Sequence, residues 1–125
     1  MANPNVRVDV IPRYLVEESS DEKKRYVFSY TVTIHNEGER TAQLLSRHWI
    51  ITNGETLKTQ EVRGDGVIGK QPTILPGESY TYTSGTVMET PVGTMQGSYR
   101  MIDDEGIYFD VPIPVFTLAA THSVH

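Results

Sequence analysis

The 125-residue sequence predicts a single all-β domain, built as a sandwich of about seven to eight short strands. Apolar and polar residues alternate with period two in several runs that are rich in β-branched and aromatic residues. Turn-forming residues separate these runs. No segment of ten or more residues shows a helical hydrophobic period, so the pattern favours strands throughout.

The alternation begins near the N-terminus, where every second residue from 6 to 10 is a valine, and this predicts the first strand. The segment 16–25 (VEESSDEKKR) is charged and has no apolar stripe, so we expect a loop or at most one helical turn there. Aromatic and aliphatic residues then occupy alternate positions from 26 to 34. This is the pattern of a half-buried strand.

Turn signals separate the later runs. Asn53-Gly54 lies between two strand-like segments and predicts a hairpin with a type I′ turn, which needs positive φ at both central residues. Pro76-Gly77 matches the central positions of a type II turn. The polar segment 103–106 predicts a loop between two apolar runs.

The last strands follow the same logic. The runs 79–86 and 93–101 alternate in polarity and predict two further strands. Pro112 and Pro114 cannot donate to a sheet ladder, so the final segment is expected at a sheet edge.

Composition excludes several classes of function. The chain has 11 Lys and Arg against 16 Asp and Glu, a net charge of −5, and lacks the basic balance of a nucleic-acid or anionic-membrane binder. It contains no cysteine, which excludes disulfides, thiolate catalysis and zinc-finger sites. No signal-peptide pattern or apolar run of about 20 residues occurs. We therefore expect a cytoplasmic protein with neither nucleic acid nor membrane as partner.

Three glycines in RGDGVIGKQP (63–72) have the spacing G-x-G-x-x-G, namely Gly64, Gly66 and Gly69. In a dinucleotide-binding site this motif opens a helix. Two prolines and a strand follow it here, and Lys70 is not followed by the Ser or Thr of a P-loop. We interpret the motif as a turning loop. An alternative is that its backbone amides, with Lys70 nearby, bind an anion weakly.

Two segments contain candidate metal ligands. An acidic loop offers carboxylate oxygens but lacks EF-hand spacing, and two histidines form H-x-x-H near the C-terminus. These candidates are Asp103, Asp104, Glu105, His122 and His125. We expect an ordered core over about 5–119 and a flexible tail over 120–125. No set of residues has a spacing typical of catalysis, so we expect neither an enzyme nor a cofactor.

Several segments together resemble the bacterial ApaG family, over nearly the whole chain and in the expected order. They are RHWIIT (47–52), GDGVIGKQP (64–72), YTSGT (82–86), TPVGTMQGSY (90–99) and FDVPIPVFTL (109–118). The resemblance implies one ApaG domain over 1–125 with an immunoglobulin-like or fibronectin type III-like antiparallel β-sandwich. The chain departs from the family at Lys70, where an acidic residue is usual.

The resemblance also implies expectations about function. The family has no established enzymatic activity, is linked to cobalt resistance and magnesium efflux, and has relatives in eukaryotic proteins that look like partner-binding modules. Our leading hypothesis is a non-enzymatic interaction module with an unidentified protein partner, and an edge strand would also allow a homodimer. The alternative is a protein of metal-ion homeostasis that binds a divalent cation or an anionic ligand such as phosphate or a nucleotide. The expected binding surface comprises Gly64, Gly66, Gly69, Lys70, Thr83, Ser84, Gly85, Thr90 and Pro91.

Overall fold

The computed structural model describes residues 5–120, which form eight β-strands and one short 3-10 turn. The turn, η1 (Val16–Glu18), lies in the segment expected to be a loop or a single helical turn. None of the helical structure in the described residues is long and apolar enough to cross a membrane. The strands are β1 (Val6–Tyr14), β2 (Tyr26–Asn36), β3 (Ala42–Asn53), β4 (Thr59–Asp65), β5 (Thr73–Ile74), β6 (Ser79–Met88), β7 (Val92–Asp103) and β8 (Tyr108–Ala119).

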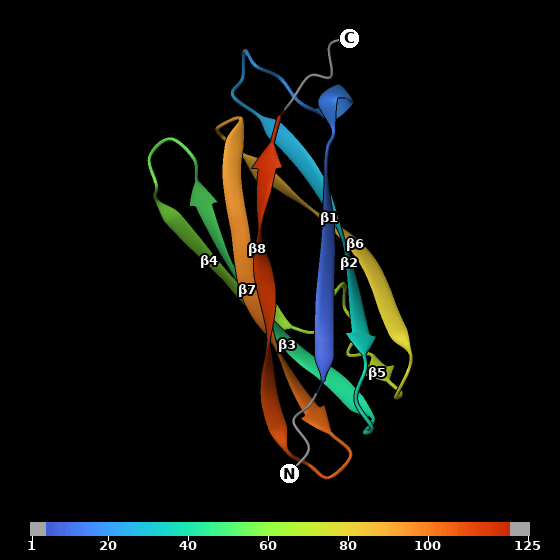
Figure 1. The fold of residues 1–125 in the computed structure, drawn as a ribbon. Coiled ribbons are helices and arrows are strands. Elements are labelled where there is room, and N and C mark those ends of the chain that lie inside the picture. The colour runs from blue at the N-terminus through green and yellow to red at the C-terminus, as the bar shows by residue number, and fades with distance from the viewer. Residues whose placement is uncertain (1–4, 121–125) are drawn as a thin grey trace.

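The strands form two antiparallel sheets that pack face to face (Figure 1). One sheet has the order β1-β2-β6, and the other has the order β4-β3-β7-β8. The short strand β5 pairs with the start of β3, on the same edge as β4, because β7 occupies the other edge of β3. This confirms the predicted immunoglobulin-like or fibronectin type III-like sandwich.

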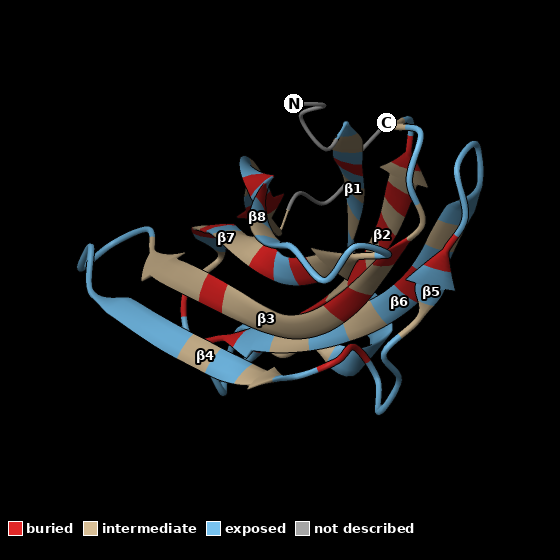
Figure 2. Cartoon of the chain, turned by 90° about the horizontal axis from the view of Figure 1, so that it is seen from below, coloured by how far each residue is buried: buried red, intermediate tan, exposed pale blue. Residues whose placement is uncertain are grey.

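The core lies between the sheets, and the alternation of residues decides what enters it. Buried positions recur as separate bands along β2, β3 and β7 (Figure 2). Trp49 is central, since its ring lies 5.3 Å from that of Tyr30, 6.3 Å from that of Tyr99 and 5.9 Å from that of Phe116. Burying side chains of this size contributes roughly 2–3 kcal/mol each to folding.

One long side of the sandwich is closed and the other is open. The outer strands β1 and β8 lie side by side and close the first side (Figure 1). At the opposite side, the outer strands are β4 and β6, and neither has a second hydrogen-bonded neighbour among the described strands. The edge position of β8 agrees with the expectation from Pro112 and Pro114.

The hairpin between β3 and β4 forms, but its predicted type I′ turn is wrong. The hairpin closes through the Asn53 amide, which donates to the Lys58 carbonyl at 2.9 Å around a longer loop. Positive φ occurs at Leu57 (62°) rather than at Gly54. The Gly54 amide instead donates to the Val92 carbonyl at 2.9 Å, so a contact with β7 determines the loop geometry.

The turn before β6 is of the predicted type II. Gly77 has φ of 82°, and the Glu78 amide donates to the Leu75 carbonyl at 2.9 Å. The predicted polar loop 103–106 also connects β7 to β8 as expected.

Candidate functional site

A groove of ≈ 370 Å³ runs along the open side of the sandwich, between β6 and the β3–β4 hairpin. Strands β6 and β4 form its two walls, and aromatic and aliphatic side chains from the sandwich interior form its floor. The lining residues are Tyr30, Arg47, Trp49, Ile51, Gln60, Val62, Ser84, Gly85, Thr86, Val87 and Met95.

The groove exists because two successive inward positions of β6 carry small side chains. Alternation along β6 directs Tyr82, Ser84, Thr86 and Met88 toward the other sheet. Tyr82 and Met88 are large and buried in the core, whereas Ser84 and Thr86 between them leave the space over Trp49 unfilled.

A β-bulge places Arg47 at the end of this groove. The register of β3 against β7 shifts at 44–46, and this shift moves the odd-numbered residues after it onto the inward face. The guanidinium packs on Gly64, where a Cβ atom would lie 2.7 Å from Arg47 Nη2. Nη1 donates to the carbonyls of Asp65 at 3.0 Å and Gly66 at 2.9 Å. Nε and Nη2 of Arg47 have no hydrogen-bond partner within residues 5–120.

Two further polar atoms on the groove floor lack a protein partner. Neither Tyr30 Oη nor Trp49 Nε1 takes part in a hydrogen bond within residues 5–120, although both residues are almost fully buried. No completely buried side-chain nitrogen or oxygen among the described residues is unpaired, so solvent reaches both atoms. Both side chains line the groove, which is therefore the place where a ligand could meet them. Together with Arg47 and Ser84, they supply a set of hydrogen-bond donors.

Two buried tyrosines, Tyr82 and Tyr99, lie near Arg47. The hydroxyls of Tyr82 and Tyr99 bond to each other in the core. Burial raises the pKa of Tyr82 to about 12 and also raises the pKa of Tyr99, while the charge of Arg47 acts in the opposite direction on both. Both hydroxyls therefore stay protonated at neutral pH, and neither neutralises the arginine.

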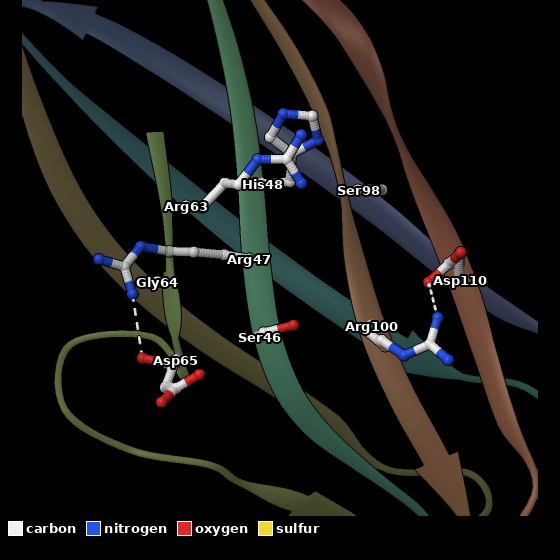
Figure 3. A pocket seen from close by; sticks show the side chains of 9 residues that line it. All are labelled: Ser46, Arg47, His48, Arg63, Gly64, Asp65, Ser98, Arg100 and Asp110. Atoms are coloured by element: carbon white, nitrogen blue, oxygen red, sulfur yellow. Dashed lines mark hydrogen bonds and ion pairs between the residues drawn. The ribbon is translucent and has the colours of Figure 1, made fainter. Parts of the chain in front are cut away.

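A second hollow, of ≈ 550 Å³, lies on the outer face of the larger sheet (Figure 3). Most of its charged side chains form ion pairs, either within the hollow or with Glu61 beside it. Arg100 bonds to Asp110 at 3.3 Å, and Glu61 bonds to His48 at 2.7 Å and to Arg63 at 3.2 Å. The hydrogen bond from His48, with the charge of Arg63, lowers the pKa of the Glu61 carboxyl. The hollow is lined by Ser46, Arg47, His48, Arg63, Gly64, Asp65, Ser98, Arg100 and Asp110.

The G-x-G-x-x-G motif forms a tight hairpin turn and opens no helix. The amide of Val67 donates to the carbonyl of Lys70 at 2.8 Å, and the amide of Lys70 donates back at 3.0 Å. The two central residues, Ile68 and Gly69, have φ of 48° and 71°, which is the type I′ geometry. The Gly66 amide donates to β3. These amides are therefore used within the chain, and the side chain of Lys70 is exposed.

The TSGT segment is divided between two faces of β6. The hydroxyl of Thr83 bonds to that of Thr31 at 2.9 Å on the outer face of the smaller sheet. Its neighbour Ser84 faces the groove, as alternation requires, and Gly85 also lines the groove.

The remaining residues of the expected surface lie elsewhere. Thr90 is buried, and its hydroxyl donates to the Val92 carbonyl at 2.9 Å. The Pro91 carbonyl accepts a hydrogen bond from the Ala120 amide at 2.7 Å, next to the start of β7, which pairs with the end of β3. Gly64 instead pairs with Arg47 in the middle of β3. The nine residues therefore do not form one surface, and of them only Gly64, Gly66, Ser84 and Gly85 line the groove or contact its arginine. A binding role for each of them stays a prediction.

The candidate metal ligands of the acidic loop do not converge on a common point. An oxygen of Asp103 accepts hydrogen bonds from two loop amides, and Asp104 and Glu105 each pair with Arg40 at 3.0 Å. Within 5–120, no group of three or more His, Cys, Asp or Glu side chains is placed to hold a metal ion. The other candidates, His122 and His125, lie outside the described residues, as does most of the predicted tail.

Sequence analysis missed Arg47 as a groove residue. Its inward position depends on the bulge at 44–46, and no feature of the sequence marks that bulge. The available signal was the pair of small residues, Ser84 and Thr86, at inward positions of an alternating strand.

Comparison with known proteins places the groove within a matched domain. The family model of the ApaG domain, DUF525, matches residues 16–103, a segment that holds all residues of the groove. The chain belongs to the ApaG family. Protein ApaG of Pseudomonas aeruginosa is 60% identical over 121 residues, covering 97% of this chain and 94% of that protein. Protein ApaG of Escherichia coli is 53% identical over 123 residues, with 98% of each chain covered.

A solved structure of similar sequence has the same fold. The crystal structure of the ApaA protein from Bordetella pertussis superposes with a TM-score of 0.90 and 52% identity, covering 93% of this chain and 94% of that one. The ApaG resemblance predicted from the sequence motifs is thus confirmed.

Proposed function

We propose that this ApaG protein is a non-enzymatic interaction module that binds a protein partner along its open side. The observation that carries the proposal is the groove between two free strand edges. Free edges offer backbone N–H and C=O groups to an added strand, and a groove beside them accepts alternate side chains of that strand.

The dimensions of the open side suit a short extended segment. An adjoining hollow of ≈ 340 Å³ shares Ile51, Gln60 and Val87 with the groove and continues it toward the loop that joins β3 to β4. The two concavities follow β3 from Arg47 to Asn53, which corresponds to roughly 20 Å of extended chain. A partner segment of about six residues would fill this length.

The net charge of −5 favours a partner other than nucleic acid or an anionic membrane, and we propose that the protein acts in the cytoplasm. A homodimer through a free edge is a special case of the same binding mode. In this proposal, the link of ApaG proteins with cobalt resistance and magnesium efflux is indirect and acts through the partner. Direct binding of a divalent cation or an anionic ligand is the second candidate function.

Site-specific photo-crosslinking tests the proposal. A benzoylphenylalanine at the exposed Gln60 of β4 borders the groove without filling it, and one at the adjacent Glu61 faces the opposite side of the same strand. In cells of the organism that encodes the chain, we expect a discrete crosslinked protein from the Gln60 variant and none from the Glu61 variant. Equal crosslinking from both positions, or none from Gln60, would contradict the proposal.

A further inference from the structure

We infer that the groove selects an extended segment that carries an aspartate or glutamate side chain, and that Arg47 binds this carboxylate. The inference rests on the proposed function and specifies the chemistry of the partner.

The free nitrogens of Arg47 have the arrangement that a carboxylate requires. Nη1 is held by the carbonyls of Asp65 and Gly66, which fixes the plane of the guanidinium. Nε and Nη2 carry parallel N–H bonds, and neither is used within residues 5–120. Such a fork binds the two oxygens of a carboxylate at once, and a guanidinium already held in place loses little rotamer freedom on binding.

The charge of the groove favours an acidic group. Arg47 is the only charged residue of those lining the groove. It forms no ion pair with any described carboxylate. Asp65 contacts it, but through the backbone carbonyl and not through the side-chain carboxylate (Figure 3). A partner carboxylate would supply the missing counter-charge.

The spacing of the groove also predicts the neighbours of the acidic residue. Arg47, Trp49 and Ile51 point inward in succession, about 7 Å apart. A strand laid along them presents alternate residues to the groove. With its carboxylate at Arg47, it would place a side chain two positions away over Trp49 and one four positions away beside Ile51. The lining there is apolar, so we expect an apolar residue two or four positions from the acid.

A displayed library of random octapeptides, selected on the immobilised full-length chain, tests the inference. Binders that also bind a Ser84→Phe variant are removed, because phenylalanine at this position fills the groove. We expect the remaining peptides to be enriched in Asp or Glu with an apolar residue two or four positions away. A synthetic copy of an enriched peptide should lose at least tenfold in affinity when its acid is changed to the amide. Arg47→Gln in the protein should cause a similar loss.

The amide peptide keeps the test independent of folding, because the protein itself is unchanged. Groove-dependent peptides without acidic enrichment, with affinities unaffected by the acid-to-amide change, would overturn the inference and leave the interaction module intact. If no peptide distinguished the chain from Ser84→Phe, both the inference and the proposed groove would be overturned.

Discussion

The hydroxyl groups of Tyr82 and Tyr99 form a hydrogen bond across the core and thereby join the two sheets. Tyr82 belongs to β6 in the smaller sheet, and Tyr99 belongs to β7 in the larger one. The charge of Arg47 acts on both hydroxyls, so the pair lies near the arginine of the groove. It contributes to the packing of the sandwich, and its neutral hydroxyls leave the charge of Arg47 uncompensated.

This pair predicts a loss of stability in alkali. Burial raises the pKa of Tyr82 to about 12, against about 10 in an unfolded chain. The stabilisation is fully present below about pH 10 and is lost as the pH rises toward 12, because the unfolded chain releases the proton first. Urea unfolding at a series of pH values should show this decline, and Tyr82→Phe should reduce its slope. Complete tyrosine ionisation near pH 10 in a protein that stays folded would contradict the assignment.

The turn of the glycine motif predicts two substitutions with opposite effects. Ile68 is exposed and has φ of 48°, a conformation that strains a β-branched residue. Ile68→Asn should therefore stabilise the protein by about 1 kcal/mol, since asparagine tolerates this region. Gly69→Ala at φ of 71° should destabilise it by about 1 kcal/mol. Thermal and urea unfolding of both variants measures the difference, and effects of the same sign would count against the type I′ geometry.

Trp49 is the chain's only tryptophan, so its fluorescence reports directly on the groove. Ser84→Phe should lower quenching by acrylamide, because the added ring covers the solvent-accessible indole nitrogen. Thr83→Phe adds the same ring on the other face of β6 and should leave quenching unchanged. Equal quenching in the two variants would show that the groove is not the route by which solvent reaches Trp49.

Cobalt(II) offers a test of the second candidate function. The acidic loop 103–105 uses its oxygens for loop amides and Arg40, so we expect no saturable paramagnetic broadening of its amide NMR signals. A magnesium series serves as the diamagnetic reference. Saturable broadening at this loop would favour direct cation binding over the interaction module.

The fold was predictable from the sequence because period-two alternation decides which face of a strand is buried, as the run from Tyr26 to Ile34 illustrates. The turns were less predictable. Asn53-Gly54 has the preferred residues of a type I′ turn, yet the contact of Gly54 with Val92 imposes a longer loop. The type I′ turn forms at Ile68-Gly69 instead, although a β-branched residue such as Ile68 is unfavourable at the first central position. Hydrogen bonds between Val67 and Lys70 close this turn.

The groove was harder to predict for a different reason. Simple alternation continued from Ala42 and Leu44 would direct Arg47 to the solvent, and the bulge between Leu44 and Ser46 reverses that assignment. The pairing that creates the bulge involves β7, which lies far along the chain. The inward position of Arg47 therefore cannot be predicted from the residues next to it in the sequence.

The arrangement of the outer strands also limits how this protein can assemble. Growth of an open-ended fibre by edge pairing needs two available edges that face away from each other. Here β1 and β8 lie against one another, while β4 and β6 border the same groove. One added strand there obstructs access to both remaining edges. We therefore expect the proposed edge pairing to terminate after a single step and to yield closed pairs rather than polymers.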